Sequence, residues 1–219
     1  MIEAVVFDLD GVLVDSEPVW EQVRRRVVAD YGGHWDADTQ DRLMGLSTGE
    51  WSRYLSEDLG VRLSPPEVAD VVIEAMASAY REHLPLLPGA VEAVRRMGSR
   101  WTLGLASSSP PSLIWTVLDA AGLRPLFAAV MSTEEVARGK PAPDIYLEVA
   151  ARLEVPPTAC VAVEDSSNGL RAAAAAGFVV IAVPRPAYPP APDALRAARL
   201  VLPSLVELTV GAVAALGTD

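Results

Sequence analysis

Short apolar runs alternate with helical segments along most of this chain, and that alternation constrains its fold more than any other feature. The first run is rich in Val and bounded by acidic residues, as is typical of a strand buried in a parallel sheet. The runs occupy residues 2–9, 101–106, 128–131, 159–163 and 178–183, and a last apolar stretch lies at 200–202. Segments with helical spacing of apolar residues lie between them at 89–97, 111–121, 143–153 and 168–176. This order predicts an α/β fold with a doubly wound parallel sheet.

Residues 16–84 interrupt this alternation. They contain helical patterns at residues 18–31, 37–44, 48–59 and 65–83, and no convincing strand pattern. An all-helical insertion after the first strand divides the chain into two domains. We therefore expect residues 1–15 and 85–219 to form the α/β core, and residues 16–84 to form an inserted helical cap domain.

The composition narrows the possible partners. The chain has 219 residues, a formal net charge of −11 and a pI near 4.6, so it lacks the basic surface that binding to a nucleic-acid backbone requires. No apolar stretch reaches the roughly 18 to 20 residues of a membrane span. The N-terminus has no signal-peptide pattern. We expect a cytoplasmic protein with neither nucleic acid nor membrane as a partner.

Polar side chains end the predicted strands, where ligands bind in open parallel sheets. Because the carboxyl ends of parallel strands meet at one edge, these side chains are expected to lie close together. Strand by strand they are Asp8 and Asp10; Ser107, Ser108 and Ser109; Lys140; and Glu164 and Asp165.

Carboxylates that share a site raise one another's pKa values, so a cluster of this kind needs a positive counter-charge. Mg²⁺ prefers oxygen ligands and binds carboxylates together with a substrate phosphate. Lys140, the single lysine of the sequence, adds a second positive centre, facing either a carboxylate or a phosphoryl group. Phosphoryl transfer requires this neutralisation of charge. In such chemistry Asp8 acts as the nucleophile and Asp10 as the acid and base.

These residues lie in motifs that carry a resemblance. VVFDLDGVLVDSE, GLASSS, GKPAPDIY and VEDSSNGLRAA resemble, in order, the four motifs of the haloacid-dehalogenase-like superfamily, and the insertion resembles its α-helical cap. The resemblance implies a Rossmann-like core, and an aspartyl-phosphate intermediate on Asp8 with Asp10 as acid/base. It implies phosphate binding by Gly11, Ser107, Ser108 and Lys140, and Mg²⁺ binding by Asp8, Asp10, Glu164 and Asp165, with Glu164 direct or through water.

Several reaction classes occur in this superfamily, and the residues favour a phosphatase. A dehalogenase needs neither the acid Asp10 nor the metal ligands. A phosphonatase resembling the known family needs a cap lysine, and residues 16–84 contain none. A β-phosphoglucomutase-like enzyme has a His where this chain has Trp20, and an Arg in the loop that reads LMGLSTGE here. Mutase activity remains the alternative, together with a phosphoglycolate-type phosphatase and, least favoured, a non-enzymatic phospholigand-binding protein.

DSEPVW, LPLLPGAVEAV, GLASSSP and LPSLVEL look like the bacterial hexitol and 2-deoxyglucose-6-phosphate phosphatases. The resemblance therefore predicts a small phosphorylated metabolite, a sugar or polyol phosphate, as substrate. A cap closes over such a site and meets the non-phosphate part of the substrate. The candidates for this contact are Glu17, Trp20, Arg24, Met44 and Thr48. The alternative for each is an ordinary place in the core or on the surface of the cap.

Overall fold

The computed structural model describes residues 1–44 and 46–217. Gly45, in the loop that follows the second predicted cap helix, and the last two residues of the predicted core domain lie outside the described residues. The chain forms two compact units. One comprises Met1–Asp15 with Pro85–Asp219, and the other comprises Ser16–Leu84.

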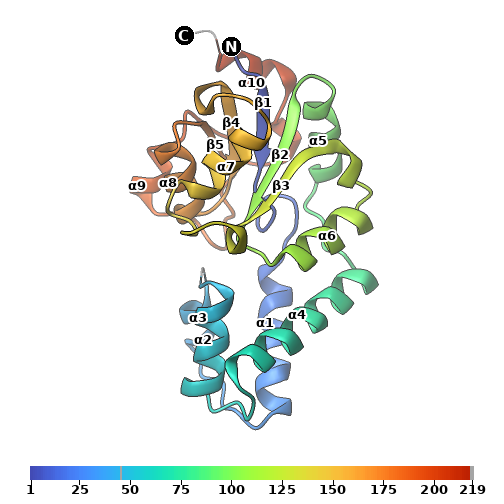
Figure 1. Ribbon diagram of the computed structural model, residues 1–219, viewed down its shortest axis with the longest axis vertical. Coiled ribbons are helices and arrows are strands. Elements are labelled where there is room, and N and C mark those ends of the chain that lie inside the picture. Colours follow the sequence, from blue (N-terminus) through green and yellow to red (C-terminus); the bar gives the residue numbers. More distant parts are fainter. Residues whose placement is uncertain (45, 218–219) are drawn as a thin grey trace. The chain divides into compact units, whose positions relative to one another are not determined.

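The first unit is built on a six-stranded sheet in the order β3-β2-β1-β4-β5-β6 (Figure 1). The strands are β1 (Ala4–Phe7), β2 (Thr102–Ser107), β3 (Phe127–Ser132), β4 (Cys160–Glu164), β5 (Val179–Ala182) and β6 (Leu200–Val201). All neighbouring strands pair in parallel. The order reverses between β1 and β4, where doubly wound sheets bind ligands at their carboxyl edge. The predicted α/β fold with a doubly wound parallel sheet is confirmed.

Helices cover both faces of this sheet (Figure 1). On one face lie α5 (Ala90–Gly98) and α6 (Pro111–Ala120), and on the other lie α7 (Asp144–Arg152) and α8 (Ser167–Ala175). Right-handed crossovers produce this division. The shorter elements of the unit are η2 (Arg124–Leu126), η3 (Thr133–Glu135), η4 (Pro157–Ala159), α9 (Pro192–Leu195), η5 (Leu205–Glu207) and α10 (Val210–Ala215).

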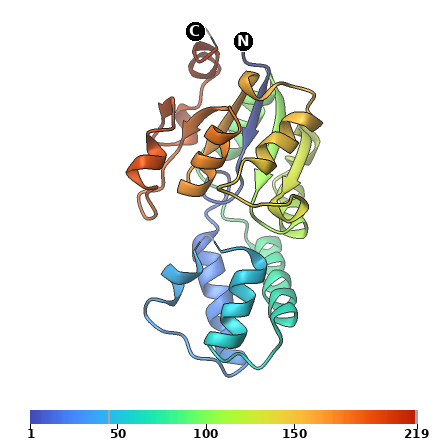
Figure 2. The same ribbon diagram turned by 60° about the vertical axis from the view of Figure 1, so that its left-hand side comes forward.

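The regular elements in the described part of the second unit are helices, joined by loops (Figure 2). It contains α1 (Glu17–Asp30), α2 (Thr39–Leu43), α3 (Thr48–Arg53), the π-helix η1 (Tyr54–Asp58) and α4 (Pro65–Glu82). The long helix α4 packs against α1 and α3. Capping boxes begin α3 and α4, because Ser47 and Ser64 each pair with a Glu three residues later. The segment predicted as one helix at 48–59 is an α-helix that continues as a π-helix.

In the parts of the chain that the structure describes, no helix combines the length and the apolar character that a bilayer span requires.

Gly104 in β2 provides a test of how tightly helix α7 packs on the sheet. A Cβ atom at this position would lie 2.7 Å from Val149 Cγ1 and 3.2 Å from Val6 Cγ2. We expect Gly104→Val to lower the free energy of unfolding by about 1–3 kcal/mol, the cost of overpacking a core, as measured by urea denaturation. Gly211→Ala is the control, because its nearest neighbour is 3.9 Å away. Equal stability of the two variants would contradict this packing.

Candidate active site

Three buried carboxylates meet at the carboxyl edge of the sheet. Asp8 follows β1, and its backbone N–H donates to Val163 O on β4 (3.0 Å), which places it beside the end of that strand. Glu164 ends β4, and Asp165 follows it. One carboxylate oxygen from each of the three lies within 4.8 Å of the others. The predicted convergence of these strand ends is therefore observed for Asp8, Glu164 and Asp165.

Lys140 lies within the same cluster. Its Nζ donates to Asp8 Oδ1 and to Glu164 Oε1, each at 2.6 Å, and to the carbonyl of Ala106 at 3.0 Å. Only 4% of its side chain is exposed. The loop that carries it precedes α7 and is braced by Arg138, which forms a bidentate pair with Asp144 at 3.1 and 2.9 Å. The ammonium group bridges two carboxylates that lie far apart in the sequence.

The cluster has more negative charge than Lys140 offsets. Burial raises the pKa of Asp8 to about 8, against the lowering effect of Lys140, and Glu164 and Asp10 raise it further. Burial also raises the pKa of Asp165 well above its ordinary value, and the charges of Glu164 and Asp8 add to this rise. Burial alone would lower the pKa of Lys140, but Asp8 and Glu164 hold it above its usual value. The site as a whole favours an additional cation.

The donors of this cluster fit a hard divalent cation. All of them are carboxylate oxygens, the ligand type that such ions prefer. Asp165 Oδ1 is buried and has no hydrogen-bond partner among the described residues, so its lone pairs remain available. Gly11 lies against the same carboxylate with φ +79°, and a Cβ atom there would overlap the Asp165 carboxylate. Only glycine therefore leaves room for the Asp165 side chain in its present position.

Asp10 is held by serine hydroxyls from the end of β2. Its Oδ2 accepts from Ser109 Oγ at 2.8 Å and from Ser107 Oγ at 3.2 Å. Ser107 Oγ in turn accepts from the backbone N–H of Ser109 at 3.0 Å. Ser108 lies between them and is exposed. The structure brings Ser107 to Asp10 as the strand ends predicted, and adds Ser109 as a second donor.

Three residues that contact the predicted site were given no role from the sequence. Ser109 was named among the side chains at the strand ends, and it donates to Asp10. Tyr146 donates from Oη to Glu164 Oε1 at 2.7 Å, yet its position matches an ordinary apolar site of helix α7. Gly169 in α8 lies so close to Glu164 that a Cβ atom would overlap that carboxylate. The spacing of apolar residues gave no signal for Tyr146 or Gly169, although both lie in the motifs GKPAPDIY and VEDSSNGLRAA that carry the resemblance.

The cap candidates lie in different environments within the second unit. Trp20 and Arg24 are buried in its core, where the Arg24 guanidinium stacks 4.5 Å from the Trp20 ring and 5.2 Å from the Trp51 ring. Glu17 is half-buried and accepts from Gln40 Nε2 at 3.0 Å. Met44 and Thr48 are half-buried. For Trp20 and Arg24 the placement matches the alternative of a role in the packing of the unit.

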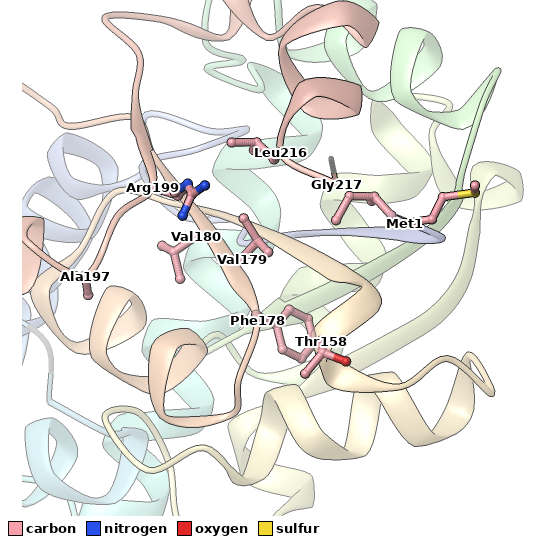
Figure 3. Close-up of a pocket in the computed structure, with 10 residues that line it drawn as sticks. Met1, Thr158, Phe178, Val179, Val180, Ala197, Arg199, Leu216 and Gly217 are labelled. Carbon is pink, nitrogen blue, oxygen red and sulfur yellow. The ribbon is translucent and has the colours of Figure 1, made fainter. Parts of the chain in front are cut away.

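A separate pocket of about 370 Å³ lies near the start of several strands, away from the carboxylates (Figure 3). Most of the described residues that line it have apolar side chains, and Arg199 is the charged side chain among them. The lining residues are Met1, Ile2, Thr158, Phe178, Val179, Val180, Ala197, Arg199, Leu216 and Gly217. The pocket contains none of the predicted site residues, so the carboxylate cluster remains the candidate active site.

Comparisons with known proteins identify a family and similar structures for the chain as a whole. A family model for haloacid dehalogenase-like hydrolases matches residues 2–177. Hexitol phosphatase B of Escherichia coli (strain K12) is 37% identical over 230 residues, which covers 95% of each chain. The structure of CbbY from Rhodobacter sphaeroides in complex with phosphate has a TM-score of 0.84 and 29% identity, covering 95% of this chain and 96% of that one. The structure of β-phosphoglucomutase from Clostridium difficile has a TM-score of 0.82 and 26% identity, covering 98% and 96%.

The chain belongs to the haloacid dehalogenase-like hydrolase family. The predicted resemblance is thereby confirmed, and it extends over both the α/β unit and the helical insertion.

The contact between Gly169 and Glu164 gives a test of the cluster. Gly169→Ala would push the Glu164 carboxylate away from Lys140, because the added Cβ overlaps it. We expect the binding of a divalent cation at the cluster to weaken by about tenfold or more, the usual cost of disturbing a metal site's surroundings, as measured by calorimetry. Asn168→Ala, one residue earlier on the same helix, adds no atoms and serves as the control. Wild-type affinity for the divalent cation in Gly169→Ala would show that Glu164 does not contribute to the site.

Proposed function

We propose that this chain is a Mg²⁺-dependent phosphatase that hydrolyses small phosphate monoesters, with sugar or polyol phosphates as its substrate class. One observation carries the proposal. A buried Asp8 is held by Lys140 beside Glu164 and Asp165, with Asp10 two residues further on. In this arrangement Asp8 is the nucleophile and Asp10 the acid/base, and the carboxylates together carry more negative charge than Lys140 offsets. The family membership and the hexitol phosphatase relative support a phosphoric monoester hydrolase.

The reaction proceeds in two steps on the side chains of this unit. A carboxylate oxygen of Asp8 attacks phosphorus, the bond to the leaving oxygen breaks, and Asp10 gives that oxygen a proton. Asp10 then takes a proton from the water that hydrolyses the aspartyl phosphate, which frees inorganic phosphate and Asp8. Lys140 offsets charge on Asp8 and on the phosphoryl oxygens, while Gly11, Ser107 and Ser108 bind the phosphate.

Mg²⁺ would be held by the carboxylates of Asp8, Glu164 and Asp165 and by the Asp10 carbonyl, and would neutralise charge on the transferring phosphoryl group. Three of these residues form the buried group within 4.8 Å, which supports the assignment. In the same proposal Ser107 leaves Asp10, to which it now donates at 3.2 Å, when a phosphoryl oxygen replaces that acceptor.

The proposed substrate class rests on the relatives and on the helical insertion. Hexitol phosphatase B is named for a polyol phosphate, and this chain covers 95% of its length. Residues 16–84 act in the proposal as the cap domain that selects the leaving group. Glu17, Met44 and Thr48 remain the stronger candidates, because Trp20 and Arg24 are buried against Trp51. The cytoplasmic location and the lack of a nucleic-acid partner stay predictions.

The second candidate function is a sugar phosphomutase, because the β-phosphoglucomutase structure shares the fold over 98% of this chain. A mutase must return the phosphoryl group to a second hydroxyl and requires a bisphosphate to start. Trp20 replaces the His expected of that group, and its ring is occupied by Arg24 at 4.5 Å. Hydrolysis is therefore favoured.

The test is phosphate release from a panel of sugar, polyol and short acid phosphates, with and without Mg²⁺. We expect release to need Mg²⁺ and Asp8→Asn to lower it by at least about 1,000-fold, as loss of a nucleophile does. Asn keeps the shape of the side chain, so circular dichroism of the variant should match the wild type. Asp119→Asn, an exposed surface aspartate, should retain full activity.

The ranking of the panel separates hexose and polyol phosphates from phosphoglycolate. No release from any ester by the folded protein, followed by turnover once a sugar bisphosphate is added, would replace the phosphatase with the mutase. Full activity of Asp8→Asn would remove the proposed nucleophile.

A further inference from the structure

Tyr146 places a hydroxyl group deep beside the carboxylate cluster. It is the third residue of α7, its side chain is fully buried, and its Oη donates to Glu164 Oε1 at 2.7 Å. Burial raises the pKa of this phenol well above its ordinary value, and the charges of Glu164 and Asp8 add to the rise, so the hydroxyl stays protonated and can donate.

The ring of Tyr146 has contacts on two sides. It packs edge-on against the ring of Phe178, with the two ring centroids 5.2 Å apart. On another side, Lys140 Nζ lies 5.3 Å from the centroid of the Tyr146 ring. One side chain therefore contacts both members of the Lys140–Glu164 pair, the ammonium through its ring and the carboxylate through its hydroxyl. A phenylalanine would fill the same volume, so only the hydroxyl distinguishes Tyr146 from an ordinary core residue.

The two oxygens of Glu164 have separate sets of donors. Oε2 accepts from the backbone N–H of Asp165 at 3.1 Å and from Ser166, through its N–H at 3.3 Å and its Oγ at 3.2 Å. Oε1 accepts from Lys140 and from Tyr146. Oε2 is thus fixed by the turn that follows β4, while the direction of Oε1 depends on Lys140, itself on a loop, and on the hydroxyl presented by helix α7.

We propose that Tyr146 is a positioning residue for the active site. Its hydroxyl holds Glu164 in the orientation in which Oε1 binds Lys140, and thereby keeps Lys140 on Asp8 and the three carboxylates at the spacing that binds a divalent cation. Tyr146 contacts neither substrate nor cation and acts through Glu164. The part of this inference that concerns Mg²⁺ rests on the proposed function, whereas the part that concerns Lys140 does not.

The chain offers a direct probe, because Lys140 is its single lysine. The full-length protein, labelled with lysine that carries ¹³C at Cε alone and freed of metal, gives one lysine Cε signal in NMR spectra. We expect Tyr146→Phe to shift this signal, and a Mg²⁺ titration followed by the same signal to show about tenfold weaker binding than in the wild type. In Glu164→Gln, adding Tyr146→Phe should change Mg²⁺ binding by less than about twofold, because the two residues act together.

The control is Phe178→Leu, which removes packing from the Tyr146 ring but keeps the hydroxyl. This variant should lower the melting temperature, because it removes packing from the core. It should leave Mg²⁺ affinity within about twofold of the wild type, because the hydrogen bond from Tyr146 to Glu164 is kept. An unmoved Lys140 signal together with wild-type Mg²⁺ affinity in Tyr146→Phe would overturn the proposal. An equal loss of affinity in the wild-type and Glu164→Gln backgrounds would also overturn it, because Tyr146 would then not act through Glu164.

If the wild-type protein binds no Mg²⁺, the metal requirement of the proposed function fails. The NMR signal of Lys140 in the metal-free protein then tests the positioning role of Tyr146 without the Mg²⁺ titration. A shift in Tyr146→Phe supports the positioning role, and an unchanged signal overturns it.

Discussion

The buried bridge from Lys140 to Asp8 and Glu164 is the interaction on which the rest of the site depends. Removing charges from water costs several kcal/mol per ion, so a buried bridge persists only where further hydrogen bonds satisfy its groups. Here both contacts measure 2.6 Å, and the Ala106 carbonyl takes a third bond from the ammonium. Even so, the cluster holds three buried carboxylates and one lysine, and the remaining negative charge makes the site receptive to a divalent cation.

Strand pairing and close packing in the α/β unit hold the carboxylates of this site in fixed positions. Parallel strands bring Asp8 and Glu164 to one edge, because β1 and β4 pair in register from Ala4 with Cys160 to Phe7 with Val163. Glycines then allow the close approach of backbone to carboxylate at positions 11 and 169, where a Cβ atom would overlap Asp165 and Glu164 respectively. Groups fixed by packing in this way can stabilise a transition state without reorganising during the reaction.

The strand-end side chains were predictable because strand periodicity and parallel pairing follow from local sequence. Asp8, Lys140 and Glu164 come together as those patterns predict. Contacts across layers were not predictable. Tyr146 matched an apolar position of a helix, and nothing in its spacing indicated a carboxylate partner on β4. The burial of Arg24 matches the alternative of a place in the cap core, but its contact with Trp51 was not predictable, because Trp51 is distant in the sequence.

The covalent role of Asp8 is the central claim, and trapping the intermediate tests it most directly. The protein is mixed with p-nitrophenyl phosphate and Mg²⁺, quenched during turnover and reduced with borohydride, which converts an aspartyl phosphate to homoserine. Peptide mass spectrometry then shows which aspartate has been converted to homoserine. Reduction confined to Asp8, and absent without substrate, is the predicted result. Unmodified Asp8 in a sample that releases phosphate at its full rate, or reduction at another aspartate, would contradict it.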